Sequence, residues 1–273
     1  MTIKGALQPD QQPQLWDDHV SLYVDVFEPF TLELALKAIN ALGLKPGSRV
    51  IDIGAGAGGA ALELACRGHK VTAIDASPAM IARAKERAKA EGLALDAFVM
   101  DGQELELPDA SFDAGLSVFG IILFPDAMAG LAELRRVVRP KGPIALVTWT
   151  EPGAYELATE LRAAAASVFG ELPAGALPAQ LRFEEFEAFH ALFAEAGLDA
   201  ITIESVTASF HTPAARWLAD RIAFAPGMAA MLKGYGARQA AILEVFVDRL
   251  ESRFGNGPME LGARVFIGTA TAP

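Results

Sequence analysis

Three aspartates stand in successive apolar segments, at positions where their side chains could bind the parts of a charged nucleoside. Asp52 lies in VIDIG, Asp75 in VTAIDA and Asp101 in FVMDG. The second could accept hydrogen bonds from both hydroxyls of a ribose, and the third could accept one from the amino group of adenine. Each such charge-assisted bond contributes about 1.5–3 kcal/mol. One aspartate alone would equally fit a turn or a helix cap, whereas three beside one glycine loop indicate a ligand site.

The glycine loop GAGAGG (54–59) follows the first aspartate. Glycine permits positive φ and lets a ligand lie against backbone amides. Gly54, Gly56 and Gly59 also match the dinucleotide pattern G-x-G-x-x-G, so two cofactors compete. We expect Asp52 at the exposed tip of its strand, where it would repel a pyrophosphate and attract ammonium and sulfonium charges. This favours S-adenosylmethionine over a nicotinamide dinucleotide.

Alternating apolar and amphipathic segments must position these side chains. Strand patterns followed by helix patterns predict a parallel sheet with helices on both faces. Such sheets bind ligands at the carboxyl ends of their strands, which would bring the three aspartates together. After residue 150 the rhythm changes, and the last two strands could pair antiparallel at the sheet edge. The predicted strands are 49–54, 70–76, 95–102, 112–120, 143–150, 199–210 and 263–272.

Bulk properties limit the partners. The net charge of −11 disfavours nucleic acid and anionic membranes, which require clustered Lys and Arg. No apolar stretch of about 18 residues predicts a membrane span, and the N-terminus lacks an apolar signal region, so a cytoplasmic location is expected. The lone Cys66 forms no internal disulfide, and we expect it to be buried in a helix. No metal site is expected.

The motifs resemble those of class I S-adenosylmethionine-dependent methyltransferases, in particular the small-molecule branch related to ubiquinone and menaquinone biosynthesis methyltransferases. The resemblance rests on VIDIGAGAGG, VTAIDASPAMIARAKERA, DGQELELPDASFDAGLSVFGIILFPD, AELRRVVRPKG and PIALVTWT in this order. It implies a Rossmann-like, doubly wound, seven-stranded sheet with an antiparallel last strand. From the order of the elements we further expect helical lid insertions within one domain, 1–273: an N-terminal helical lid (1–43), a cofactor-binding core (44–150), and substrate lid helices with the final two strands (151–273).

The resemblance also implies a set of cofactor-binding positions, running from the methionine end of S-adenosylmethionine to its adenine. These are Asp52, Gly54, Ala55 and Gly56 at the methionine end, Asp75 at the ribose, Ala76, Met80, Asp101, Gly102 and Gln103 around the adenine, Ser117, Val118 and Phe119 near the amino group and methyl donor, and Tyr23 as a cover. The chain departs from the family at Ala55 and Ala57, where relatives carry Cys or Thr. It also departs at 140–143, which replaces a Pro-Gly-Gly turn.

Methyl transfer from a sulfonium is an in-line displacement that needs alignment and little competing water. No catalytic base is evident: His19 and His211 are weak candidates, His69 is expected at the surface, and His190 is expected to pack in a lid. An apolar or aromatic small-molecule acceptor is expected, with Phe119 and Trp149 as substrate-binding residues. The other apolar candidates are expected mostly in the core: Ile121, Ile122, Phe124, Tyr155, Phe183, Phe186, Phe210, Trp217, Phe224, Met228 and Met231.

Two other functions remain open from the sequence. An NAD-dependent oxidoreductase would explain the glycines and Asp75 but leaves Asp52 and Asp101 without a role. A non-catalytic protein that binds S-adenosylmethionine as a regulatory ligand would need the same cofactor residues and no acceptor site.

Overall fold

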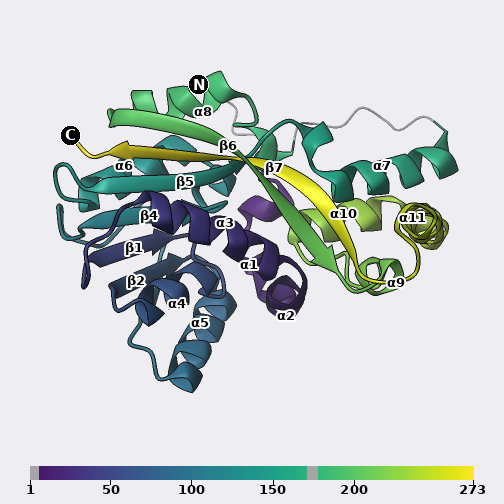
Figure 1. Ribbon diagram of the computed structural model, residues 1–273, viewed down its shortest axis with the longest axis horizontal. Helices are drawn as coiled ribbons and strands as arrows, with labels where there is room; N and C mark the ends of the chain where they lie inside the picture. Colours follow the sequence, from purple (N-terminus) through teal and green to yellow (C-terminus); the bar gives the residue numbers. More distant parts are fainter. Residues whose placement is uncertain (1–5, 171–177) are drawn as a thin grey trace.

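Seven strands form one mixed sheet in the computed structural model, which describes residues 6–170 and 178–273. The order is β3-β2-β1-β4-β5-β7-β6, and β7 runs antiparallel to both of its neighbours. This confirms the predicted doubly wound, Rossmann-like α/β sheet with an antiparallel last strand (Figure 1). Residues 1–5 and 171–177 of the two predicted lids lie outside the described residues. The strands are β1 Arg49–Ile53, β2 Lys70–Asp75, β3 Asp96–Val99, β4 Ala114–Val118, β5 Pro143–Trp149, β6 Asp199–Thr212 and β7 Met259–Thr271.

Each face of the sheet carries its own hydrophobic core, because successive strand residues point to opposite faces. Val50 of β1 packs in a core with one group of helices, and Ile51 and Ile53 pack in a second core with another group. Helices therefore cover both faces, as predicted. The first group is α3 Glu28–Ala41, α4 Gly59–Cys66 and α5 Pro78–Glu91; the second is α6 Ala127–Val137 and α8 Phe186–Glu195.

The helix that follows β2 begins and ends where its sequence indicates. The hydroxyl of Ser77 accepts a hydrogen bond from the backbone N–H of Met80, and Pro78 occupies the first turn of α5. Gly92 ends the helix with φ 67°. These caps define where α5 begins, directly after the carboxyl end of β2, and where it ends.

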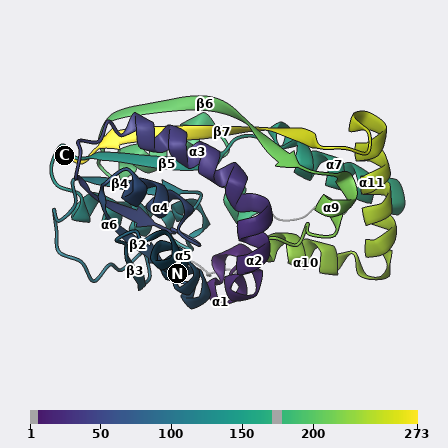
Figure 2. The ribbon, with the colours of Figure 1, turned by 60° about the horizontal axis from the view of Figure 1, so that its bottom comes forward.

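The pair β6–β7 extends past the rest of the sheet. β5 pairs with β7 as far as Trp149, opposite Val265, whereas β6 and β7 stay paired to Thr212 and Met259. The extension leads to a group of helices beyond the carboxyl edge of the sheet (Figures 1 and 2). These helices are α7 Glu156–Phe169, α9 Ala215–Ala219, α10 Pro226–Gly234 and α11 Gln239–Phe254.

The N-terminal segment links the sheet to that helical group. A carboxylate oxygen of Asp17 accepts a hydrogen bond from Ser77 at the start of α5 (2.6 Å), and one of Asp10 accepts from the N–H of Gly227 in α10 (2.6 Å). Its elements are η1 Pro9–Gln11, α1 Pro13–Trp16, η2 Asp17–His19, α2 Val20–Leu22 and a π-helical turn, η3 Tyr23–Phe27, that continues into α3. The remaining short helices are η4 Ile121–Leu123, η5 Pro152–Ala154, η6 Ala179–Leu181 and η7 Gly236–Arg238.

Two local expectations are wrong. Cys66 is exposed, because it is the last residue of α4 rather than part of its buried face. The third strand ends at Val99, so Asp101 lies in the following loop rather than at the strand end. Among the described residues, no helix is both long and apolar enough to cross a membrane.

Candidate cofactor and acceptor site

The glycine loop makes a tight turn between β1 and α4. Gly54, Gly56 and Gly58 have φ values of 71°, 55° and 87°, a region that other residues rarely adopt. A Cβ atom on Gly54 would lie 2.6 Å from the Cα of Gly120. The ring of Tyr23 covers the loop, since a Cβ on Gly56 would lie 3.6 Å from Cε1 of that tyrosine.

Asp75 holds this loop in place. One of its carboxylate oxygens, Oδ2, accepts a hydrogen bond from the N–H of Gly56, and the other, Oδ1, accepts one from the N–H of Ser77, both at 2.9 Å. Burial raises the pKa of the carboxyl, and the two backbone bonds oppose that rise. Each oxygen keeps a second lone pair that can face a ligand.

Asp52 is buried, and the expectation that it sits at an exposed strand tip is wrong. It is the fourth of the five residues of β1, with a relative exposure of 1%. Its Oδ2 atom has no hydrogen-bond partner among the described residues. Burial, followed by the negative charge of Asp75, raises the pKa of Asp52 to about 7. A cation beside this carboxylate would compensate a charge that the protein leaves unmatched.

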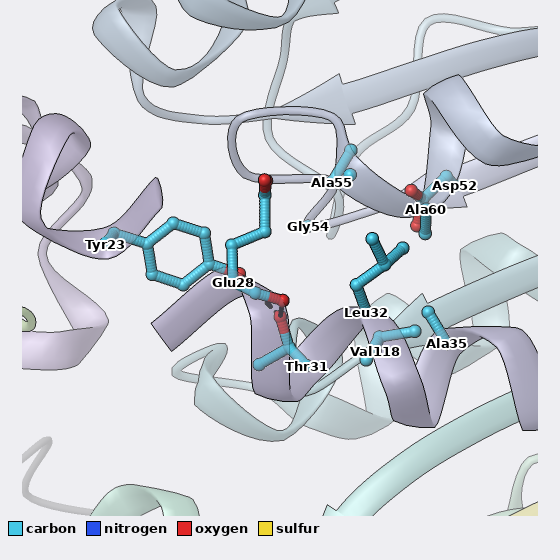
Figure 3. Close-up of a pocket in the computed structure, with 11 residues that line it drawn as sticks. Tyr23, Glu28, Thr31, Leu32, Ala35, Asp52, Gly54, Ala55, Ala60 and Val118 are labelled. Atoms are coloured by element: carbon cyan, nitrogen blue, oxygen red, sulfur yellow. Dashed lines mark hydrogen bonds between the residues drawn. The ribbon is translucent and has the colours of Figure 1, made fainter. Parts of the chain in front are cut away.

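Asp52 borders a small cavity of about 20 Å³ between β1, the glycine loop and α3, large enough for one water (Figure 3). Ala55, Tyr23 and Thr31 also line it. Glu28 lies on its wall and is neutralised by Arg87, 2.8 Å away.

The loop after β3 presents a second polar group. Oδ1 of Asp101 accepts hydrogen bonds from the N–H of Gln103 (2.9 Å) and from its Nε2 (3.0 Å). The intervening Gly102 is buried, and a Cβ there would lie 2.6 Å from the ring of Phe124 and 2.7 Å from Cγ2 of Ile53. Glycine therefore keeps the loop pressed onto the sheet.

One large cavity, about 1270 Å³, runs from these groups toward α7 and α10. Most of the predicted site residues line it: Tyr23, Gly54, Gly56, Asp75, Ala76, Met80, Asp101, Gly102, Gln103, Val118, Phe119 and Trp149. Asp52 and Ala55 line the small cavity instead. Ser117 lines neither, because its hydroxyl donates to the carbonyl of Ile53 (2.7 Å) and accepts from the N–H of Ile121 (3.0 Å) behind the wall.

Aromatic rings form the wall beyond the cofactor end. The ring centroids of Phe119 and Trp149 are 4.7 Å apart, and those of Trp149 and Tyr155 are 4.6 Å apart. Phe119 has φ 56°, an uncommon conformation for a bulky residue that turns the chain sharply after β4. Burial raises the pKa of the Tyr155 phenol, so this group stays protonated at neutral pH.

The expectation that most other apolar candidates belong to the core is confirmed: all of them are buried in the core or pack against it except Phe186 and Met231, which are exposed. Some of these core residues also line the cavity. The residues that line the cavity are Ile122, Phe124, Tyr155, Phe224, Met228 and Met231, whereas Ile121, Phe183, Phe186, Phe210 and Trp217 do not. Sequence reasoning missed Arg162 and Tyr235 altogether. Their helical spacing from Tyr155 and from Met228 was the available signal, but core faces of helices show the same spacing.

None of the four histidines lines the large cavity. Nδ1 of His19 lies 2.8 Å from the carbonyl oxygen of Ala223, and His211 lies at the surface beside Glu260. His69 lies in the turn between α4 and β2 and is partly exposed. His190 is exposed on α8, so its expected packing in a lid is wrong: α8 covers the sheet.

A family model described as a methyltransferase domain matches residues 50–142, which carry the glycine loop and all three aspartates. A demethylmenaquinone methyltransferase of Beutenbergia cavernae is 38% identical over 116 residues, covering 42% of this chain and 46% of that protein. The chain belongs to the class I S-adenosylmethionine-dependent methyltransferases. The cofactor of this family is S-adenosylmethionine, which decides between the two cofactors that fit the glycine pattern.

Other relatives extend the comparison of this methyltransferase beyond its core. An uncharacterized protein of Mycobacterium tuberculosis is 36% identical over 185 residues, covering 65% of this chain and 66% of that protein. The matched regions thus span about two thirds or less of these relatives. The crystal structure of the cyclase SpnF has a TM-score of 0.60 at 20% identity and 98% coverage of both chains. A phosphoethanolamine N-methyltransferase of Haemonchus contortus in complex with S-adenosyl-L-methionine also scores 0.60, at 20% identity, over 100% of this chain and 61% of that one. At such identities the likeness concerns the fold alone.

Proposed function

We propose that this methyltransferase transfers the methyl group of S-adenosylmethionine to a small apolar or aromatic acceptor. The observation that carries the proposal is the continuity of the cavity from the glycine loop to the aromatic wall. Its volume, about 1270 Å³, exceeds the roughly 300–1,000 Å³ of sites that hold one small ligand. The cavity therefore has room for cofactor and acceptor side by side.

The residues at the sheet edge fit the cofactor. The unmatched carboxylate of Asp52 suits the cationic methionine end, and the spare lone pairs of Asp75 suit ribose hydroxyls. Asp101 can accept a hydrogen bond from the adenine amino group, above the close-packed Gly102. Met80 and Ala76 offer apolar contact to the base.

The chain's own contribution to the reaction is alignment and exclusion of water. When bound, S-adenosylmethionine supplies an electrophilic methyl group on a positively charged sulfur. Phe119 and Trp149 keep the acceptor beside that end of the cavity and exclude water from it. No histidine lines the described cavity, so no histidine acts there as a base. The Tyr155 phenol stays protonated at neutral pH and therefore does not act as one either. Alignment of this kind can lower a barrier by up to about 7–11 kcal/mol.

Cofactor binding and turnover must be measured separately, because one fold can host different functions. Calorimetry with S-adenosylhomocysteine and with NADH tests the cofactor, and we expect binding of the first only. Conversion of S-adenosylmethionine to S-adenosylhomocysteine is then followed over phenols, quinols, amines and fatty acids. Turnover with only charged, polar acceptors would contradict the acceptor class. Tight cofactor binding without turnover on any acceptor would favour a regulatory protein.

A further inference from the structure

Arg162 is the one cationic side chain among the described residues that line the large cavity. The other charged lining residues are Asp10, Asp75 and Asp101. Asp75 and Asp101 belong to the cofactor end, and Asp10 is bound to the N–H of Gly227 at the start of α10. Arg162 is exposed, so its positive charge lies where the cavity opens to solvent, at the edge of an otherwise acidic and apolar lining.

The charge of Arg162 is not neutralised by any described residue through an ion pair or a hydrogen bond. Neighbouring arginines of the same helical group do find partners: Arg216 pairs with Glu244 at 2.6 Å, and Arg249 pairs with Glu160 at 2.8 Å. Glu160 lies two residues before Arg162 in α7 and points to α11 instead. The Arg162 guanidinium therefore keeps its five donors available to a ligand.

The position of Arg162 on α7 determines how far this residue lies from the aromatic wall of Phe119, Trp149 and Tyr155. Tyr155, Ala158 and Arg162 recur at helical spacing, so all three line the cavity along one face. Seven residues of helix span about 10 Å. The ring of Tyr155 contacts that of Trp149, whose ring stacks on Phe119, so the backbone of Arg162 lies about 10 Å along α7 from the aromatic wall.

Between these two ends the cavity is apolar. Met228 and Met231 of α10 line it, together with Tyr235, the residue that follows α10. Burial raises the pKa of the Tyr235 phenol, and the nearby positive charge of Arg162 partly opposes this rise. Arg162 and Tyr235 thus form a polar end to an apolar chamber.

We propose that Arg162 binds a carboxylate of the acceptor, whose apolar body lies along α10 and whose methylated atom lies near Phe119 and Trp149. This inference rests on the proposed function and narrows its substrate class to apolar carboxylic acids. The planar guanidinium can bind a carboxylate through two parallel hydrogen bonds, which fixes both position and orientation. The carboxylate binds at the far end of the acceptor, at a residue about 10 Å along α7 from Tyr155, and is not the group that is methylated.

The test compares an acid with its neutral amide on the protein saturated with S-adenosylhomocysteine. The probes are 6-phenylhexanoate and 6-phenylhexanamide, which share the apolar body, and their dissociation constants are measured by calorimetry. We expect the acid to bind at least tenfold more tightly to the unaltered protein. Arg162→Gln should reduce this preference to less than twofold, and Arg162→Lys should keep part of it. Arg83→Gln, which removes a partly exposed arginine of α5 outside the cavity, should leave the preference for the acid unchanged.

Equal binding of acid and amide by the unaltered protein would overturn the inference, and so would a preference that persists in Arg162→Gln. The first step of the experiment, binding of S-adenosylhomocysteine, distinguishes a failure of the proposed function from a failure of the Arg162 assignment. If S-adenosylhomocysteine does not bind, the cofactor proposal fails. If it binds and the two probes do not differ, only the assignment of Arg162 fails.

Discussion

The Oδ2 atom of Asp75 accepts a hydrogen bond from the backbone N–H of Gly56 at 2.9 Å, across the gap between two neighbouring parallel strands. The residue predicted to hold the cofactor's ribose therefore also shapes the glycine loop. Its second oxygen anchors the N–H of Ser77, which caps α5. Loop, strand end and helix start are thus joined through one carboxylate.

Asp75→Ala should weaken binding of S-adenosylhomocysteine by about 10- to 100-fold, the equivalent of one lost charge-assisted contact or more. The loss combines missing contacts to the ligand with a loosened glycine loop. Calorimetry gives the affinity, and thermal unfolding shows whether the fold survives. Asp96→Ala, which removes an exposed carboxylate at the start of β3, is the control and should leave affinity unchanged. Unaltered affinity in Asp75→Ala would contradict the ribose assignment.

The sheet could be predicted from the sequence because its strands are short apolar runs separated by well-capped helices. Ser77, Pro78 and Gly92 mark the bounds of α5 locally, and the parallel order follows from the alternation of strands and helices. The convergence of Asp75 and Asp101 on one cavity follows from the same rule. The burial of Asp52 could not be predicted, since it depends on α3, whose residues Leu32 and Ala35 line the same small cavity as Asp52.

The acceptor half of the cavity could not be predicted, because it depends on contacts between distant segments. Asp10 bonds to Gly227, more than 200 residues away, and no local pattern marks either residue as a partner. β6 and β7 remain paired beyond Trp149, the last residue of β5. The alternation of buried and exposed residues only weakly specifies how far two strands stay paired at their ends. Arg162 is an exposed helical arginine, and no local pattern shows that it lines a cavity together with residues of α10.

Asp52→Asn should have opposite effects on the fold and on the cofactor. An acid whose pKa is raised on folding, here to about 7, destabilises the folded state as pH rises from its unfolded value of about 4 through 7. The asparagine variant without cofactor should therefore be more stable at pH 8, by on the order of 2–4 kcal/mol, and this gain should vanish near pH 4. Urea unfolding at both pH values measures it.

Because the pKa of Asp52 is raised, we predict that cofactor binding depends on pH. A cationic cofactor favours the ionised form, so binding below pH 7 must displace a proton from Asp52. Affinity for S-adenosylmethionine should rise with pH up to about 7 and level off above it. In Asp52→Asn the profile should be flat and the affinity at pH 8 lower. An identical profile in both proteins would show that Asp52 does not face the cation.

Gly102→Ala should impair cofactor binding by moving a loop. Its methyl group would lie 2.6 Å from the Phe124 ring, a contact that the loop can relieve only by shifting off the sheet. Such overpacking costs about 1–3 kcal/mol. We expect a lower melting temperature and weaker binding of S-adenosylhomocysteine. Gly234→Ala is the matched control, since a Cβ there meets nothing within 4 Å. Equal behaviour of the two variants would mean that the loop is not constrained at Gly102.

Arg182 should control the affinity for the acceptor through the loop after β4. Its guanidinium donates to the carbonyls of Ile122 (2.6 Å), Phe124 and Pro125 (3.3 Å), and its Nε donates to that of Ala179 (3.2 Å). It therefore fastens η6 to a segment that lines the cavity. Arg182→Gln should raise the KM for the acceptor several-fold more than that for the cofactor. Arg182→Lys, which keeps the charge but not the planar donor set, should be intermediate. Steady-state kinetics with both substrates varied would reveal an equal change in both KM values if the prediction is wrong.

Tyr155→Phe should leave turnover intact and slightly stabilise the protein. The phenolic oxygen is buried without a hydrogen-bond partner among the described residues, and burial raises its pKa, so it neither accepts a proton from the acceptor at neutral pH nor contributes to stability. Replacing an unsatisfied buried hydroxyl removes a desolvation cost of about 1–3 kcal/mol, while the ring keeps its contact with Trp149. Thermal unfolding and the pH dependence of kcat measure the two effects. Tyr155→Leu should instead impair acceptor binding, because it removes the ring from the aromatic wall. A large drop in kcat with a changed pH profile in Tyr155→Phe would identify the phenol as a proton carrier and would overturn a mechanism based on alignment alone.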